Sequence, residues 1–87
     1  MNRIKIVYNN PMGFHARPAT MFSKVASEYK SNITVKNGDK ETDSKNIIGL
    51  LTLNINPGDE MEIIADGSDE EAALKALKNL IENDFDE

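Results

Sequence analysis

The chain has 87 residues and no cysteine, and its 15 acidic residues outnumber the 10 basic ones to give a formal net charge of −5. Its length fits one domain, residues 1–87, without room for a large internal substrate cavity, and its charge argues against nucleic acid and anionic membranes as partners. The lack of cysteine excludes disulfides and thiolate metal sites, and no stretch is long and apolar enough to insert in a membrane, so we expect a cytoplasmic protein.

The first third of the chain predicts a strand followed by a helix. Apolar and polar residues alternate from Ile4 to Tyr8, which is the pattern of a half-buried strand. Between Ala19 and Tyr29 the apolar residues recur at intervals of three and four, with Ser23 and other polar residues on the opposite side. This spacing predicts an amphipathic helix.

The middle of the chain predicts a hairpin and a short helix. The segments NITVK and KETD flank Asn37 and Gly38, which tolerate the positive φ angles of a tight turn. The apolar run in SKNIIGLLTLNI fits either a buried strand or a short helix. We favour the helix, because Asn46 is able to cap it and Ile47 and Leu51 then lie one turn apart.

The last third predicts a turn, a strand and a final helix. NPGDE is a turn sequence, and EMEIIA alternates as a strand. Ser68 and Glu71 have the spacing of a capping box, which predicts that the final helix begins beside them. Its buried stripe would consist of Ala73, Leu77 and Leu80.

This order of elements predicts an α+β fold with helices over an antiparallel sheet. Ferredoxin-like domains, including RNA-binding ones, share the order strand, helix, strand, strand, helix, strand. Those RNA readers present aromatic residues on their sheet, whereas the inner strands predicted here have almost none. We therefore keep that architecture only as an alternative fold.

The segment NPMGFHARPA contains the only histidine, His15. Pro18 is suited to the first turn of a helix, which puts His15 at the helix N-terminus, and Gly13 admits the chain without a side chain in the way. The backbone N–H groups there, including those of Ala16 and Arg17, are free to bind an anion. The segment therefore predicts an anion-binding histidine site.

The positive end of a helix dipole disfavours imidazolium, and a neutral imidazole is a nucleophile. If a ring nitrogen of His15 takes a phosphoryl group, the helix end and Arg17 are suited to hold the new charge. The alternative is an ordinary surface histidine beside a solvated arginine. A metal site is not expected, because one histidine without cysteine does not form the usual tetrahedral site, and a hydrolytic dyad lacks an identifiable base.

Three segments resemble one known family along nearly the whole chain. GFHARPAT is similar to the active-site signature of the HPr phosphocarriers of the phosphoenolpyruvate-dependent sugar phosphotransferase system. KNIIGLLTLNI resembles the second-helix region of that family, and ADGSDEEAALKAL resembles the entry to its last helix. The resemblance implies an open-faced β-sandwich, in which a four-stranded antiparallel sheet carries three helices on one face.

The resemblance also implies a function. Members accept a phosphoryl group from phosphorylated enzyme I and pass it to the IIA domains of sugar permeases. His15 would be phosphorylated through Nδ1, and Arg17 would pair with the phosphate. The protein would be a monomeric phosphocarrier with a phosphohistidine intermediate rather than a stand-alone enzyme, and it would need neither a metal nor a cofactor.

The family docks its partners through its first two helices. The matching positions here are Thr20, Ile47, Ile48 and Leu51, and Met12 would extend the rim of this surface with its adaptable thioether side chain. An apolar residue in this region of the sequence is often an ordinary core residue, and we expect Leu50 and Leu53 to be buried in the core. For Ile47 and Ile48 both exposure and burial stay open.

The chain departs from the family at two positions. Many Gram-positive members have a regulatory serine, phosphorylated by an ATP-dependent kinase, where this chain has Asn46. Asparagine caps a helix as serine does but accepts no phosphate, and we do not transfer the role to Ser44. Phe14 replaces the usual aliphatic residue, and its role stays open. The alternatives are a nitrogen-branch paralogue of the family and a regulatory docking module in which His15 is incidental.

Overall fold

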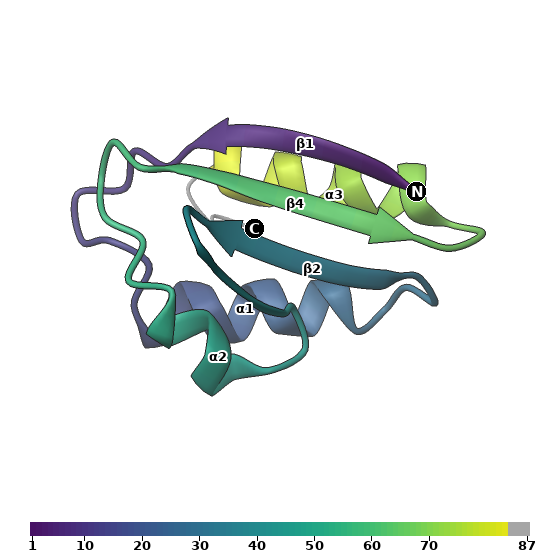
Figure 1. Ribbon diagram of the computed structural model, residues 1–87, viewed down its shortest axis with the longest axis horizontal. Coiled ribbons are helices and arrows are strands. Elements are labelled where there is room, and N and C mark those ends of the chain that lie inside the picture. Colours follow the sequence, from purple (N-terminus) through teal and green to yellow (C-terminus); the bar gives the residue numbers. More distant parts are fainter. Residues whose placement is uncertain (84–87) are drawn as a thin grey trace.

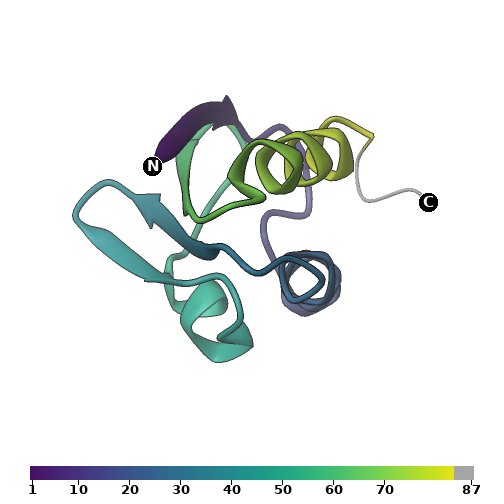
Figure 2. The same cartoon turned by 90° about the vertical axis from the view of Figure 1, so that its right-hand side faces the viewer.

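The computed structural model describes residues 1–83, which form four strands and three helices (Figure 1). The strands are β1 (Asn2–Val7), β2 (Asn32–Asn37), β3 (Lys40–Asp43) and β4 (Glu60–Asp66), and the helices are α1 (Ala16–Ala26), α2 (Ile47–Thr52) and α3 (Glu70–Glu82). The strands form one antiparallel sheet in the order β1-β4-β2-β3. Figure 2 shows all three helices on the same side of this sheet, which confirms the predicted architecture.

The hydrophobic core lies between the central strands and the helices. Alternate side chains of β2 and β4 point inward, and the helices cover them with Phe22 from α1, Leu50 from α2 and Leu77 from α3. The inward residues of the two strands are Ile33, Val35, Met61, Ile63 and Ala65. No helix within residues 1–83 has the length and apolarity needed to cross a membrane.

The first helix differs from its prediction in length and in one face. It ends at Ala26 rather than Tyr29. The N–H groups of Glu28 and Tyr29 donate to the carbonyls of Val25 and Ala26, which lie three residues back instead of the four of an α-helix. Ser23, predicted on the polar side, is buried with 6% of its surface exposed. It lies one turn from Ala19 and Ala26, so it shares their buried face.

Two local predictions in the middle of the chain are confirmed. The β2–β3 hairpin forms as predicted, but its turn lies one residue beyond the predicted pair Asn37 and Gly38. Asn37 ends β2 and pairs with Lys40, and of the two loop residues between them only Gly38 has a positive φ, +62°. Asn46 caps α2, since its Oδ1 accepts a hydrogen bond from Gly49 N at 3.0 Å. The ambiguous apolar run is therefore a short helix.

The predicted capping box of the last helix is wrong. The N-cap is Asp69, one residue beyond Ser68, and its carboxylate accepts hydrogen bonds from the backbone N–H groups of Lys30 at 2.8 Å and Ser31 at 3.0 Å and from the Ser31 hydroxyl. The Glu70 carboxylate instead accepts a hydrogen bond from Gly67 N at 3.2 Å. The donors of Lys30 and Ser31 come from a distant part of the sequence, which local spacing does not reveal.

The buried stripe of α3 is also wider than predicted. Ala73 and Leu77 are buried as expected, whereas Leu80 is only partly buried against the core. Leu74 and Ile81 complete the stripe, because they lie one turn from the other buried positions.

Candidate functional site

His15 is the N-cap of α1, with an extended backbone and an exposed side chain. The chain reaches it through a turn in which Met12 N donates to Asn10 Oδ1 at 2.9 Å and Gly13 N donates to Asn10 O at 3.0 Å. Gly13 has a φ of +73°, a conformation that favours glycine. Pro18 lies in the first turn of the helix, so the expected position of His15 at a helix N-terminus is what the structure shows.

Phe14 anchors this loop in the core beneath His15. Its backbone N–H donates to Ile55 O at 3.0 Å, and only 6% of its surface is exposed. Its ring meets Tyr8 edge-on with centroids 5.5 Å apart and Phe22 with centroids 5.9 Å apart. The structure thus places the aromatic residue whose role the sequence left open in the core, where it stiffens the approach to the site.

One carbonyl contacts both the histidine and a buried tyrosine. The Tyr8 hydroxyl donates to Gly13 O at 3.1 Å, and Nδ1 of His15 lies 3.1 Å from the same oxygen. Because a carbonyl oxygen only accepts, this contact requires a hydrogen on Nδ1. Sequence reasoning missed Tyr8, which the alternation from Ile4 marked only as a strand residue.

The helix end beside His15 is open to an anion. The backbone N–H groups of Ala16 and Arg17 have no hydrogen-bond partner within residues 1–83, and Pro18 has no N–H. The first turn carries no acidic residue. The Arg17 side chain is exposed and forms no ion pair within the described part of the chain, so its charge is available to a ligand.

The positions that match the family's docking surface are all exposed. On α2, Ile48 is 74% exposed and Ile47 and Leu51 are each 38% exposed, while Leu50 and Leu53 are buried. Met12 is also 74% exposed. Thr20 is exposed on α1, which packs against α2, and its hydroxyl donates to Ala16 O within its own helix. Docking at these residues stays a prediction.

The two positions considered for serine regulation lie in different surroundings. Asn46 is exposed and occupied in capping α2. Ser44 is fully buried, its backbone N–H donates to Ile33 O at 2.9 Å, and its hydroxyl has no hydrogen-bond partner within residues 1–83. Its burial disfavours access by a kinase.

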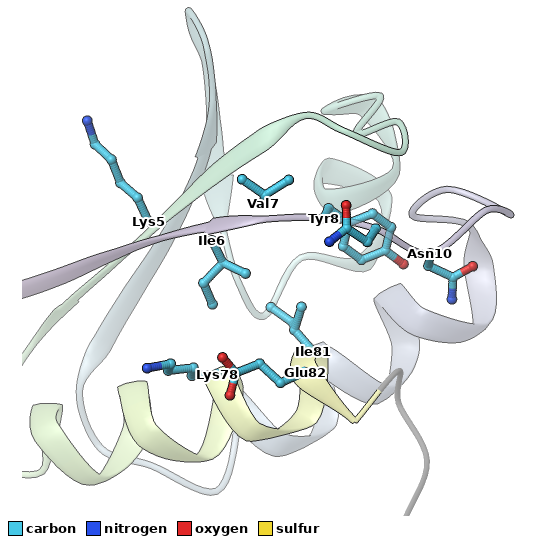
Figure 3. A pocket seen from close by; sticks show the side chains of 9 residues that line it. Lys5, Ile6, Val7, Tyr8, Asn10, Lys78, Ile81 and Glu82 are labelled. Atoms are coloured by element: carbon cyan, nitrogen blue, oxygen red, sulfur yellow. The ribbon is translucent and has the colours of Figure 1, made fainter.

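The described residues offer no enclosed reaction chamber at His15. A cavity of about 700 Å³ lies between β1 and α3, and Figure 3 shows residues such as Lys5, Ile6, Lys78 and Ile81 around it. Apart from Tyr8 and Asn10, none of its lining residues belongs to the histidine site. No group of three or more His, Cys, Asp or Glu side chains within residues 1–83 is arranged to hold a metal ion.

Comparisons with known proteins point to one family. The profile described as "PTS HPr component phosphorylation site" matches residues 3–83. Phosphocarrier protein HPr of Mycoplasma pneumoniae is 40% identical over 83 residues, which cover 94% of each chain. Phosphocarrier protein NPr of Shewanella violacea is 37% identical over 78 residues, covering 90% of this chain and 86% of that protein.

Solved structures agree with the sequence comparisons. The crystal structure of HPr-C-His from Thermoanaerobacter tengcongensis has a TM-score of 0.94 and 40% identity, and the match covers 100% of this chain and 98% of that one. An HPr dimer from the same organism matches with a TM-score of 0.79 over 100% of both chains, at the same identity. The fold and the order of elements are therefore those of this family.

Proposed function

This chain belongs to the HPr family of phosphocarriers of the phosphotransferase system, and we propose that it carries its phosphoryl group on His15. The observation that supports this most strongly is the open N-terminus of α1, where the only histidine of the chain is the N-cap. Two unpartnered N–H groups, an exposed arginine and the helix dipole favour an anion there.

The transfer needs one ring nitrogen of His15 with a free lone pair. In the proposed step the lone pair of Nδ1 attacks phosphorus while the bond from phosphorus to its donor atom on enzyme I breaks, and the bonding electrons return to that donor atom. Nδ1 must first give up its hydrogen, so the ring proton is on Nε2 during attack. The N–H groups of Ala16 and Arg17 and the Arg17 guanidinium then stabilise the phosphoryl oxygens.

The proposed partners are enzyme I as donor and IIA domains of sugar permeases as acceptors. Both must reach the same nitrogen, so both would dock beside it on the exposed residues Met12, Thr20, Ile47, Ile48 and Leu51. Apolar side chains left open on a small protein are typical of a protein-binding surface. We propose a cytoplasmic monomer, although an HPr dimer of another organism has a similar fold, and light scattering of the pure protein tests the monomer.

A nitrogen-branch carrier is the second candidate. Two observations support this candidate. The chain is similar to an NPr protein, and Asn46 stands in place of a phosphorylatable serine. The two candidates differ in donor, so the rates of phosphorylation by enzyme I from a sugar branch and from a nitrogen branch separate them. A docking module in which His15 is incidental has less support, because it requires neither His15 nor Arg17.

The decisive experiment mixes the protein with phosphoenolpyruvate, magnesium and a competent enzyme I and measures the intact mass. We expect a gain of one phosphoryl group that is labile in acid and absent from the variant His15→Ala. The matched control is Asn79→Ala, an exposed change on α3, which should still gain the group. An unmodified wild-type mass, with a known HPr phosphorylated in parallel, would contradict the carrier function.

A further inference from the structure

The Gly13 carbonyl joins the functional histidine to a buried tyrosine. We infer that Tyr8 is a positioning residue for phosphoryl transfer at His15, because its hydroxyl holds the carbonyl oxygen that Nδ1 must leave before it reacts. This inference rests on the proposed function and names a residue that deepens it. The two contacts to Gly13 O have the same length, 3.1 Å, so the oxygen is shared by two donors.

The contact between His15 and Gly13 blocks the nitrogen proposed to react. A nitrogen that donates a hydrogen to a carbonyl has no free lone pair, so Nδ1 becomes nucleophilic only when its hydrogen is lost and Nε2 carries the ring proton. The Nδ1 lone pair and the carbonyl oxygen then repel, and the contact breaks. While Nδ1 carries the phosphoryl group, it has no hydrogen and this hydrogen bond cannot form again.

Tyr8 lowers the free-energy cost of breaking the hydrogen bond between Nδ1 of His15 and Gly13 O. Gly13 is a buried residue, and a buried carbonyl left without a donor is unfavourable. Because the Tyr8 hydroxyl remains on the oxygen, the carbonyl keeps one hydrogen bond after the imidazole has left. The tyrosine therefore favours the reactive tautomer of His15 and the phosphorylated state without touching the phosphoryl group.

The tyrosine is rigid enough for this role. Only 1% of its surface is exposed, and its ring is held edge-on by Phe14 at an interplanar angle of 74°. Its backbone is fixed to the neighbouring loop, since its N–H donates to Asp59 O at 2.8 Å and its carbonyl accepts from Gly58 N at 2.6 Å. The hydroxyl is thus presented to Gly13 by a side chain with little freedom to move away.

The variant Tyr8→Phe tests the inference, because it removes the hydroxyl and keeps the ring. Nitrogen NMR of the unphosphorylated protein should show the ratio of Nδ1–H to Nε2–H tautomer of His15 raised about fivefold, the factor expected for one lost hydrogen bond of ordinary strength. The equilibrium constant for phosphoryl transfer from phosphorylated enzyme I to His15 should fall by about the same factor. Tyr29→Phe is the matched control, since Tyr29 is the only other tyrosine and its hydroxyl forms no hydrogen bond within residues 1–83.

A second change covers the case in which Tyr8→Phe loses stability. In the Tyr29→Phe background, 3-fluorotyrosine replaces only Tyr8, and its more acidic hydroxyl donates more strongly, so the tautomer ratio should move in the opposite direction, toward Nε2–H. Unchanged tautomer ratios in both variants would overturn the role of Tyr8. The tautomer measurement needs no partner protein, so a wild-type chain that is never phosphorylated would contradict the proposed function and leave this test of Tyr8 intact.

Discussion

The N-termini of α1 and α3 are opposites in chemistry. At α3 the chain places its own negative charge at the helix end, because the N-cap is Asp69 and the first turn carries Glu70 and Glu71, although the Asp69 carboxylate accepts its hydrogen bonds from Lys30 and Ser31 and not from α3. At α1 the N-cap is the exposed His15 and the first turn has no acid; neither His15 nor Asp69 caps its own helix with its side chain. Figure 1 shows the two helices running in opposite directions, so the filled end and the open end lie at opposite ends of the molecule.

The helix dipole has a different role at each of these two N-termini. A carboxylate of the chain placed at a helix N-terminus stabilises the fold, whereas an open N-terminus gives up this stabilisation and leaves the N–H groups for a ligand. Asp69 and Glu70 have lowered pKa values, the first chiefly through the hydrogen bond from the Ser31 hydroxyl and the second chiefly through the Gly67 N–H. Hydrogen bonds donated to an anion would likewise stabilise a phosphoryl group at the N–H groups of Ala16 and Arg17.

The largest expected effect comes from making the open end resemble the filled one. The variant Arg17→Glu puts an acid in the first turn of α1 and removes the exposed cation, so phosphorylation by enzyme I should slow about a hundredfold. Rapid-quench measurement of phosphohistidine gives the rate. Lys24→Glu makes the same charge change in the last turn of the same helix, and an equal loss in this control would show that net charge, not the helix end, is responsible.

The second prediction concerns the loss of the Asp69 carboxylate at the N-terminus of α3. The variant Asp69→Ala removes the charged acceptor of three hydrogen bonds from Lys30 and Ser31, and the midpoint of thermal unfolding should fall by roughly 10 °C. Phosphorylation of His15 in the folded variant should keep its wild-type rate. Asp39→Ala changes an exposed loop carboxylate without a hydrogen bond in the described chain and should leave the midpoint nearly unchanged; a similar fall there would contradict the importance of the hydrogen bonds to Asp69.

The third prediction concerns the stability of the fold at low pH. The pKa values of Asp69 and Glu70 lie below their ordinary values of 3.8 and 4.5 in the folded chain, so the unfolded chain binds protons first as the pH falls. Their contribution is complete above the ordinary values and is lost as the pH drops through the lowered ones. Urea unfolding from neutral pH to about pH 3 should show this loss, and Asp69→Ala should show a shallower one; equal slopes would contradict it.

The smallest effect concerns the third helix end. Asn46 fills the N-terminus of α2 with a neutral amide oxygen, so Asn46→Ala should lower the free energy of unfolding by about 1 kcal/mol. Asn46→Ser keeps a capping oxygen and should recover most of that loss in the same urea titration. If both variants were as stable as the wild type, the Gly49 N–H would not depend on the cap.

Residues that interact within one or two turns were predictable. The apolar periods indicated β1, β4, α1 and α3, the Asn-Gly pair and the Asn46 cap indicated the hairpin and α2, and Pro18 located the start of α1 beside His15. The error at Ser68 has the opposite origin. Its spacing to Glu71 satisfies the local rule for a capping box, but Asp69 gains donors from Lys30 and Ser31, and these contacts exist only after the chain has folded.

Sequence by itself determined the elements, the cap of α2 and the position of His15 at a helix start, because each depends on neighbours along the chain. The sequence also favoured a buried Leu50, but only the tertiary structure decided that Ile47 and Ile48 are exposed on the same short helix. It alone brought the Tyr8 hydroxyl to the carbonyl that His15 also contacts. The direction of a side chain relative to the core and a shared acceptor depend on packing between segments, which local patterns do not encode.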